Sequence, residues 1–408
     1  MNKTNIFLSS LTLCCFFAAC QSDPEAEKIT DYRYIIRDGE LRISYIADVE
    51  EVIIPPFITV DGEDYPVVSI GETAGKNMEN LKRLYLPSTI KSIGKDAFNG
   101  TYLDEVHIED LSAWCNIDFK YDVGGGNHFY YNSWASPFSE NTILYVKGER
   151  IKDLIIPNDV EKINNFAFYG LRCESVVMGD NVKTVGIKAF YENTTLEYLD
   201  LGSSVETVDQ EAFSYCEALK SINLSPRLTL MALDAFYSFQ NTGVEEVNSP
   251  DIATIAYLTA GIKDGWLPFN NAYTLLIDGK SEENIAIPFI KETLPDYCLN
   301  GAKNIKSIEC EEGIISTGEL SFSECDALER VVLPSTLKYF ISDFMYTENF
   351  RTLVVKSPEP PKVGRFGPFM PIEGSTLYVP AQSIDLYRKA DGWDKFIYIL
   401  PIEDIPAN

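Results

Sequence analysis

The apolar residues of this chain recur in a frame that repeats every 23 residues. Between Leu196 and Ala218 the frame consists of Leu196, Leu199, Leu201, Val205, Val208, Ala212 and Phe213. The stretches on either side fill the same slots, and the rings that mark the period are Phe190, Phe213 and Phe236. A period in the twenties with leucine-type positions is typical of a solenoid, whose stacked coils bury their apolar sides against one another.

The pattern within one coil predicts a short strand followed by a tight corner. Leu199 and Leu201 alternate with polar residues, which favours one strand of a parallel sheet with its leucines inward. An Ala-Phe pair follows in five coils, as Ala97-Phe98, Ala167-Phe168, Ala189-Phe190, Ala212-Phe213 and Ala235-Phe236. The alanine lets the backbone turn close to its neighbour, and the rings should form a column with offset contacts.

The repeat frame divides the chain and predicts its fold class: a β-rich leucine-rich repeat solenoid, a curved rod with a parallel sheet of short strands. Asp38-Gly39 between two alternating stretches predicts a hairpin at the start of this fold. The expected organisation is a signal peptide over 1–20, a disordered acidic tether over 21–31, a β cap with a first irregular coil over 32–75, leucine-rich repeats over 76–356 with inserts near 109–150 and 248–284, and a strand-helix cap over 357–408.

The first 20 residues have the pattern of a lipoprotein signal. Lys3 precedes an apolar run, which ends in Phe17-Ala18-Ala19-Cys20 and resembles a bacterial lipobox with cleavage before Cys20. An ordinary signal peptide with an incidental cysteine is the alternative. No other apolar run approaches membrane-spanning length, so the lipid on Cys20 is the expected membrane contact.

The residues after Cys20 predict where the lipoprotein resides. Gln21 is not an aspartate, which argues against retention at the inner membrane. The acidic tail that follows resembles the surface-export signal of lipoproteins in some Gram-negative anaerobes. We therefore expect a lipid-anchored protein of the outer membrane that is exposed on the cell surface.

Charge and cysteine usage narrow the possible partners. The formal net charge of −27 makes nucleic acid and anionic lipid poor partners, and we expect a soluble monomer. Of the nine cysteines, three lie at positions 14, 15 and 20, inside the predicted signal or at its lipidation site. The others are Cys115, Cys173, Cys216, Cys298, Cys310 and Cys325, nearly all in core slots, so we expect buried free thiols. A disulfide network is the alternative outside the cytoplasm.

The sequence offers no constellation for catalysis, and we expect neither an enzyme nor a cofactor. It has two histidines, His107 and His128, with no evident partners for a triad or a metal site. The glycines at 124–126 precede no Gly-Lys-Ser/Thr motif, so they do not predict a phosphate loop. The carboxylates fall in outward, polar slots, whereas a glycosidase pair needs a buried acid.

Aromatic residues outside the core frame are the candidates for binding. Seven rings stand between residues 114 and 134: Trp114, Phe119, Tyr121, Phe129, Tyr130, Tyr131 and Trp134. They pack the insert onto the solenoid, or they form a platform for a sugar or an apolar patch of a partner. Tyr85, His107 and Tyr198 occupy outward strand positions, where the alternative is an ordinary solvated surface. The predicted ligand contacts are Trp114, Tyr121, Phe129, Tyr130, Tyr131, Trp134, Tyr85, His107 and Tyr198.

The repeat frame, the insert 111–117 (LSAWCNI) and the ending 377–396 (LYVPAQSIDLYRKADGWDKF) resemble the BspA-type leucine-rich repeat lipoproteins of anaerobic Gram-negative bacteria from gut and mouth. The resemblance spans residues 34 to 400, with local departures from the Ala-Phe rule, such as Gly75, Ser321 and Phe344-Met345. It implies a right-handed solenoid on the cell surface and adhesins that bind host matrix proteins or other bacteria.

Two hypotheses for the function follow from the residues and the resemblance together. The first is a cell-surface lipoprotein that acts as a non-catalytic protein-binding or adhesion module, with a host or bacterial surface protein as its partner. The alternative is a glycan-capturing accessory lipoprotein of a nutrient-uptake system. A surface patch of aromatic rings is compatible with both.

Overall fold

The structure is a computed structural model and describes residues 32–123, 131–132, 135–139, 142–228, 238–257, 273–341, 344–364 and 374–406. The chain forms two compact units, and both are wound as a parallel β-solenoid. Unit 1 comprises Met1–Leu196 and Ala212–Glu217, and unit 2 comprises Glu197–Glu211 and Ala218–Asn408.

The described elements of unit 1 are short strands and one helix. They are β1 (Tyr32–Arg37), β2 (Glu40–Ile46), β3 (Glu51–Ile53), β4 (Phe57–Val60), β5 (Glu63–Ile70), β6 (Arg83–Leu86), β7 (Ser92–Ile93), β8 (Glu105–Ile108), α1 (Leu111–Cys115), β9 (Asp118–Phe119), β10 (Asp122–Val123), β11 (Tyr131–Asn132), β12 (Ile143–Val146), β13 (Glu149–Arg150), β14 (Asp153–Ile155), β15 (Lys162–Ile163), β16 (Ser175–Val177) and β17 (Thr184–Val185).

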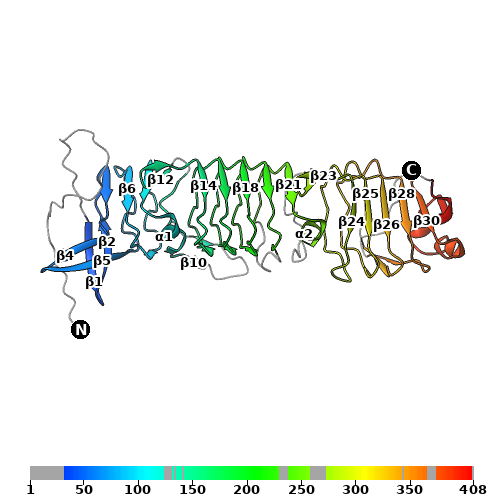
Figure 1. Cartoon of the computed structure of the whole chain (residues 1–408), viewed down its shortest axis with the longest axis horizontal. Helices are drawn as coiled ribbons and strands as arrows, with labels where there is room; N and C mark the ends of the chain where they lie inside the picture. The colour runs from blue at the N-terminus through cyan, green and yellow to red at the C-terminus, as the bar shows by residue number, and fades with distance from the viewer. Residues whose placement is uncertain are drawn as a thin grey trace. The chain divides into compact units, whose positions relative to one another are not determined.

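Unit 1 begins with the expected hairpin. β1 and β2 pair in antiparallel fashion around Asp38 and Gly39, both of which adopt left-handed backbone conformations with φ of 53° and 79°. β2 then pairs in parallel with β5, and β4 pairs with β5 in antiparallel fashion. The first coils are therefore covered by a small mixed sheet, as the alternation in the sequence predicted (Figure 1).

One parallel sheet of unit 1 runs through β3, β6, β8 and β12. These strands pair in parallel, and β13 closes the edge beside β12 as the second strand of a hairpin. The middle residues Val52, Leu84, Val106 and Leu144 are fully buried in the core. Because side chains alternate along a strand, the residues before and after each middle position lie on the outer face.

The corners of the coils confirm the predicted ring column. The Phe168 and Phe190 rings stack with centroids 5.1 Å apart, and Phe190 stacks on Phe213 at the same distance and an interplanar angle of 4°. All three rings are fully buried. The backbone passes through left-handed conformations at each corner, for example at Lys188 and Glu192, with φ of 52° and 59°. Gly170 takes the equivalent place of Glu192 in the preceding coil.

The first insert ends earlier than the sequence indicated. We expected the repeat frame to resume at about residue 151, but β12 already joins the sheet at Ile143, opposite Glu105 of β8. The insert still contains helix α1, which Asp110 caps by accepting a hydrogen bond from the N–H of Ala113. The frame was hidden because a long loop separates β8 from its neighbour, so the spacing of 23 residues does not apply there.

The described elements of unit 2 follow the same pattern of short strands. They are β18 (Tyr198–Asp200), β19 (Thr207–Val208), β20 (Ser221–Asn223), β21 (Glu246–Ser249), α2 (Ile252–Tyr257), β22 (Thr274–Ile277), β23 (Lys280–Ser281), β24 (Asn284–Ile287), β25 (Ser307–Cys310), β26 (Arg330–Leu333), β27 (Tyr339–Phe340), β28 (Thr352–Val355), β29 (Lys362–Val363), β30 (Thr376–Val379), η1 (Ala381–Ser383), α3 (Ile384–Tyr387), η2 (Trp393–Lys395), β31 (Tyr398–Pro401) and η3 (Ile402–Asp404).

The end of unit 2 is built differently from the expected strand and helix. The helical part is divided into η1, α3 and η2: α3 ends at Tyr387, and Gly392, with a left-handed φ of 83°, directly precedes η2. A further strand, β31, then pairs in parallel with β30. The buried Trp393 and Tyr387 rings pack edge to face at the end of the coils, so the predicted plug is formed by short helical turns.

Some outward strand positions of unit 2 are not on the surface. Val332 is the outward third residue of β26, but only 6% of it is exposed, because it lies in an apolar cluster against which Ile402 and Ile405 of the C-terminal segment pack. This contact joins residues about 70 positions apart in the sequence, and a pattern within one coil gives no sign of it.

Candidate functional site

Three stacked rings on the outer face of the unit 1 sheet form the candidate site. Tyr85, His107 and Tyr145 are neighbours in register on β6, β8 and β12, and we call them the ring row. The His107 ring lies 4.1 Å from that of Tyr85 and 4.4 Å from that of Tyr145, with interplanar angles of 13° and 10°. Both faces of the imidazole are thus covered by tyrosine, and 16% of the His107 side chain remains exposed.

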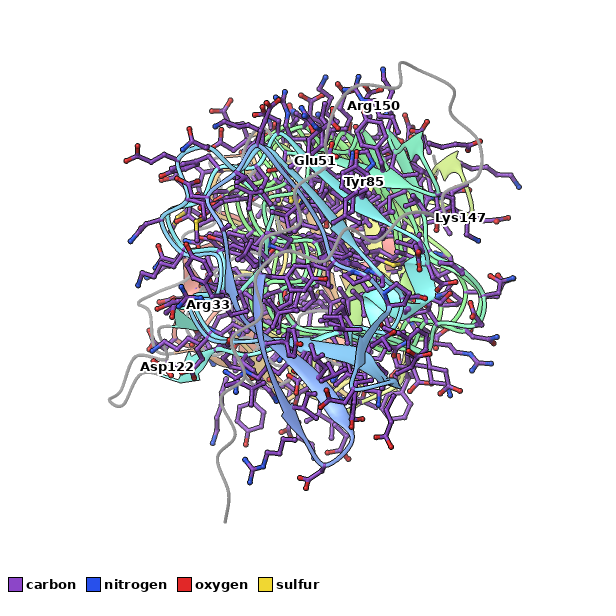
Figure 2. All side chains as sticks on the ribbon, turned by 90° about the vertical axis from the view of Figure 1, so that its left-hand side faces the viewer. Arg33, Glu51, Tyr85, Asp122, Lys147 and Arg150 are labelled. Atoms are coloured by element: carbon purple, nitrogen blue, oxygen red, sulfur yellow. The ribbon has the colours of Figure 1, made fainter. Side chains whose placement is uncertain are left out.

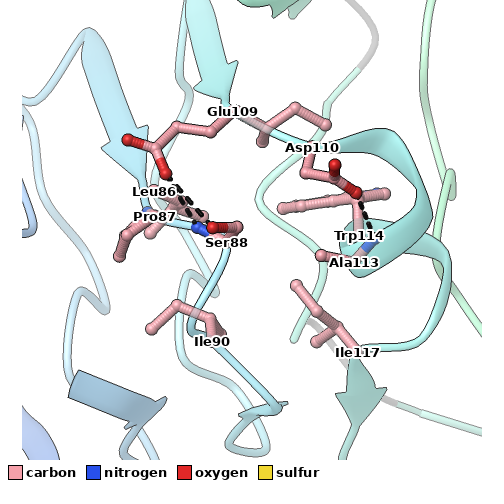
Figure 3. Close-up of a pocket in the computed structure, with 10 residues that line it drawn as sticks. Leu86, Pro87, Ser88, Ile90, Glu109, Asp110, Ala113, Trp114 and Ile117 are labelled. Carbon is pink, nitrogen blue, oxygen red and sulfur yellow. Dashed lines mark hydrogen bonds between the residues drawn. The ribbon is translucent and has the colours of Figure 1, made fainter. Parts of the chain in front are cut away.

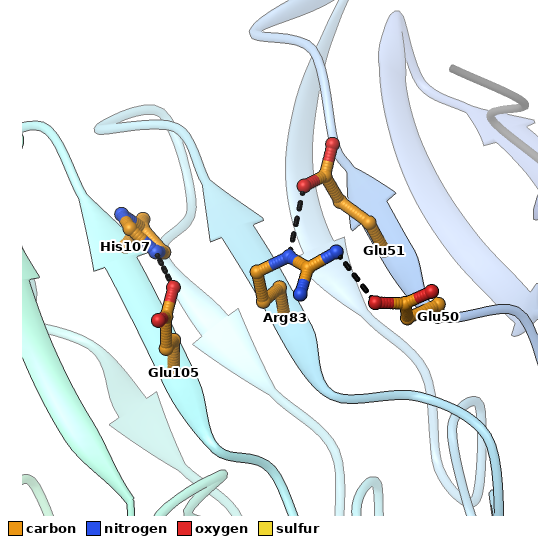
Figure 4. A network of polar contacts seen from close by, with 5 residues as sticks. All are labelled: Glu50, Glu51, Arg83, Glu105 and His107. Carbon is orange, nitrogen blue, oxygen red and sulfur yellow. Dashed lines mark hydrogen bonds and ion pairs between the residues drawn. The ribbon is translucent and has the colours of Figure 1, made fainter. Parts of the chain in front are cut away.

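Charged side chains lie beside the ring row, and Glu105 is bonded to His107 (Figure 4). The guanidinium of Arg83 donates to Glu51 Oε2 at 3.1 Å and to Glu50 Oε1 at 2.9 Å. The Nε2 atom of His107 lies 2.8 Å from Glu105 Oε2. Glu51 is the register partner of Arg83 on the adjacent strand, and Glu105 lies two residues before His107 on β8, so the sheet fixes the geometry of these two contacts.

The surroundings of Tyr85 are partly dehydrated and negatively charged. Burial raises the pKa of the Tyr85 hydroxyl, and the carboxylates of Glu51 and Glu105 raise it further. Tyrosine therefore stays protonated and can donate a hydrogen bond at the surface. In Figure 2 Tyr85 and Glu51 lie on the same side of unit 1 as Lys147 and Arg150, and away from Arg33 and Asp122.

The sequence analysis found two members of the ring row and missed the third. Tyr85 and His107 were assigned to outward strand positions, and the structure brings them into direct contact. Tyr145 lies in the part of the chain that was assigned to the first insert. The run of aliphatic and aromatic residues from Ile143 to Val146, directly before Lys147-Gly148, is a strand and turn signal that could have revealed it.

Some rings of the insert lie in the core, and others belong to residues that the structure does not describe. Trp114 was expected among the ligand contacts, but it is 2% exposed, and its indole N–H donates to the carbonyl of Ala167 at 2.8 Å. A ligand cannot reach this ring, which packs edge to face on Phe119 and Phe138. Phe129, Tyr130 and Trp134, and the side chain of Tyr131, lie outside the described residues.

Tyr121 and Tyr198 are half-buried, and both are engaged by neighbours. The Tyr121 ring lies 5.1 Å from that of Phe166, and its hydroxyl accepts a hydrogen bond from Asn165 Nδ2 at 3.1 Å. The Tyr198 hydroxyl accepts from Asn223 Nδ2 at 2.6 Å, and it lies 3.4 Å from Asp200 Oδ2. The hydroxyl groups of both residues are therefore bound to polar side chains of neighbouring coils.

A depression between Ser88 and helix α1 is too small for an organic ligand (Figure 3). Its free volume is ≈ 10 Å³, roughly the space of one water molecule. Glu109 accepts hydrogen bonds there from the backbone N–H and the hydroxyl of Ser88, at 3.2 and 3.3 Å, so it stabilises the turn after β6.

The described part of the chain holds no group of His, Cys, Asp or Glu side chains that could bind a metal ion. None of its helices is long and apolar enough to pass through a bilayer.

The six cysteines of the described residues are buried free thiols, as expected, and burial raises the pKa of Cys173, Cys310 and Cys325 to about 12 each. Such thiols are poor nucleophiles. The stacked rings of the ring row, by contrast, form a preformed surface that is suited to contacts with another molecule.

Solved structures similar to this chain include three bacterial proteins. A leucine-rich cell surface protein from Faecalibacterium prausnitzii A2-165 is 17% identical, with a TM-score of 0.46 over 93% of this chain and 96% of the other. A leucine-rich repeat protein from Bacteroides ovatus ATCC 8483 is 16% identical, with a TM-score of 0.47 over 92% and 100%. The pneumococcal vaccine antigen PcpA is 16% identical, with a TM-score of 0.40 over 92% and 98%. These likenesses carry no conclusion about ligands.

No curated protein matches the sequence. The family described as BspA type leucine rich repeat region matches it in six copies, over residues 62–120, 144–259 and 278–359. A solenoid of this kind is typically a non-catalytic binding scaffold. The match extends over more than half of the chain, which therefore belongs to the BspA-type leucine-rich repeat family.

Proposed function

We propose that this protein is a non-catalytic protein-binding or adhesion module, anchored to the outer membrane through a lipid on Cys20 and exposed on the cell surface. The ring row carries this proposal. Burial of the coils requires only the inward positions of each strand, so the core does not explain three aligned rings on the outer face. Tyrosine is enriched where proteins bind one another, because it offers a large contact area with few rotatable bonds.

The geometry of the ring row favours a protein partner over a glycan. A sugar stacks its C–H groups on the negative face of an aromatic ring. In the ring row, Tyr85 and Tyr145 each give one face to His107, and both faces of His107 are taken. On their other sides, the register partners are Ile53 for Tyr85 and Arg150 for Tyr145. The row therefore presents ring edges and hydroxyl groups, which suit the polar and apolar groups of a polypeptide.

Binding to panels of both ligand classes tests the proposal. The soluble chain from Gln21 to Asn408 is applied to purified extracellular-matrix proteins, to whole bacterial cells and to a glycan array. We expect binding to at least one protein or cell surface, and weakening by at least about tenfold in the double variant Tyr85→Ala/Tyr145→Ala. Tyr102→Ala is the matched control, because Tyr102 is a 69% exposed tyrosine of unit 1 outside the row.

Binding to glycans alone would favour the accessory lipoprotein of a nutrient-uptake system. If the double variant and the wild type bind the protein ligand with equal affinity, the ring row is not the binding site. Thermal unfolding of each variant is measured in parallel, so that a loss of binding is not confused with a loss of folding.

A further inference from the structure

Unit 2 carries an apolar row on the outer face of its sheet, and the chain itself covers it. Val332, Val354 and Tyr378 are aligned in register on β26, β28 and β30. They are 6%, 1% and 7% exposed, although they point away from the core of the coils. The three residues form a separate apolar cluster, and Ile402 and Ile405, at and just beyond η3, pack against this cluster.

The ring row of unit 1 occupies the same slot of the repeat. Val332, Val354 and Tyr378 are the third residues of their strands, as Tyr85, His107 and Tyr145 are of β6, β8 and β12. Both rows therefore lie on the outer face at the same height within a coil. What covers the row in unit 2 is a short polypeptide segment with two branched aliphatic side chains three positions apart.

From this correspondence we infer that the ring row binds a polypeptide segment of the same chemistry from a partner protein. The segment carries two branched aliphatic residues at positions i and i+3, with acidic residues near them. This inference rests on the proposed function and specifies the partner. The aliphatic side chains would lie on the ring edges, as Ile402 and Ile405 lie on Val332, Val354 and Tyr378 in unit 2.

The charge at one end of the ring row supports the acidic part of the inference. Arg150 of β13 is the register partner of Tyr145, and Lys147 follows β12 in the same hairpin. Both are exposed. The covering segment of unit 2 has Glu403 and Asp404 between its isoleucines, so a segment of this kind would place carboxylates near the two cations.

The stacked geometry reduces the entropic cost of such binding. His107 is fixed by two rings and by Glu105, so its side chain loses little freedom when a partner covers it. The same holds for Arg83, which is bound by Glu50 and Glu51. Side chains that are already held by neighbours need little rearrangement to bind a short segment.

The chain's own C-terminal segment provides the probe. A fluorescein-labelled nonapeptide with the sequence of Leu400 to Asn408, LPIEDIPAN, is titrated with the soluble chain from Gln21 to Asn408, and polarisation is recorded. We expect saturable binding that weakens at least about tenfold in Tyr145→Ala and in His107→Ala. A peptide with serine at both isoleucine positions should bind at least about tenfold more weakly. Arg150→Glu should weaken binding, whereas Lys183→Glu, an equal charge change elsewhere in unit 1, should not.

Three results would overturn the inference: no binding at millimolar peptide, equal affinity for Tyr145→Ala and the wild type, or an equal loss in Tyr102→Ala. If His107→Ala or Tyr145→Ala unfolds, hydroxyl-radical labelling of the wild-type chain replaces the variants, and the peptide must protect Tyr145 and His107. A failure of the peptide is distinguishable from a failure of the proposed function. If only the peptide inference fails, the double variant Tyr85→Ala/Tyr145→Ala still loses its binding to the protein panel.

Discussion

The six cysteines show how burial decides the chemistry of a residue. Cys115, Cys173, Cys216, Cys298, Cys310 and Cys325 are at most 2% exposed and unpaired. Desolvation disfavours the thiolate and raises the pKa of each thiol. Since the thiolate is the reactive form, these residues should act as small apolar side chains.

Thiol titration of the soluble chain from Gln21 to Asn408 checks this expectation. In native buffer without reductant, an aromatic disulfide reagent should react with fewer than about one thiol per chain within minutes. In denaturant, still without reductant, it should react with all six cysteines that follow Cys20. Fewer than six reactive thiols in denaturant would instead reveal disulfides, which are the alternative for a protein outside the cytoplasm.

Glu312 links a single carboxylate to the pH dependence of stability. Partial burial acts to raise its pKa, but hydrogen bonds from the N–H and hydroxyl of Ser335 and the N–H of Thr336, with the charge of Lys356, lower it overall. The backbone nitrogen of Ser335 lies 3.0 Å from Oε1 and 3.1 Å from Oε2 of Glu312, and the Ser335 hydroxyl oxygen lies 2.7 Å from Oε2. The carboxylate thus stabilises the turn after β26.

The lowered pKa of Glu312 sets the sign of the pH effect. The folded state prefers the ionised form, so the stabilisation is present above the unfolded pKa of about 4.5 and is lost as the pH falls through the folded pKa. Glu312→Gln should lower the free energy of unfolding at pH 7 by less than about 1 kcal/mol, because the group is exposed. Denaturant titrations of both proteins should converge as the pH falls below the folded pKa. A constant difference at every pH would contradict this role.

At the scale of elements, the corner rings determine local stability. Phe213 is fully buried and stacks on Phe190, so Phe213→Ala should leave a cavity that costs about 3–5 kcal/mol. Contacts in a solenoid are made between neighbouring coils, so the loss should be concentrated there. Hydrogen exchange should accelerate strongly in β16 and β17 and little in β1 and β2. Exposed Thr194→Ala is the control, and uniform acceleration across unit 1 would show that it unfolds as one block.

The repeat elements could be predicted from the sequence because each coil encodes its own strand and corner. Leu199 and Leu201, and the column through Phe190 and Phe213, are local patterns and occur as expected. Tyr145 was assigned to the insert, because a long insert breaks the period of 23 residues before β12, and only the local strand and turn signal at 143–148 indicates its place. The burial of Val332 depends on a distant tail, and the stacking of Tyr85 on His107 depends on the register between strands. Neither can be read from one coil.

At the scale of the whole molecule, the account depends on an anchor at Cys20. The lipobox predicts that Cys20 carries the lipid, and the acidic tail after it predicts export to the surface. Cys20→Ser should release the protein from the membrane fraction, and protease treatment of intact cells should degrade the native form. Immunoblots of fractions and of shaved cells measure both. Complete protection in intact cells would instead place the protein in the periplasm.

The high net negative charge also belongs to this scale. A formal charge of −27 keeps a large exposed surface soluble and disfavours contact with anionic lipid. The ring row, by contrast, has charges of both signs at its margins, including Arg83, Glu105 and Arg150. Specific binding should therefore depend on the local surface more than on the total charge, and it should persist at physiological salt.

Hydroxyl-radical footprinting tests the central claim most directly, because it reports on the ring row itself. The soluble chain from Gln21 to Asn408 is labelled alone and with the tightest-binding member of the protein panel, and oxidation is quantified for each residue by mass spectrometry. The account predicts that Tyr85, His107 and Tyr145 become protected together, while the exposed Tyr102 and Tyr346 keep their reactivity. Protection of Tyr102 or Tyr346, with the ring row still oxidised at its free rate, would contradict it.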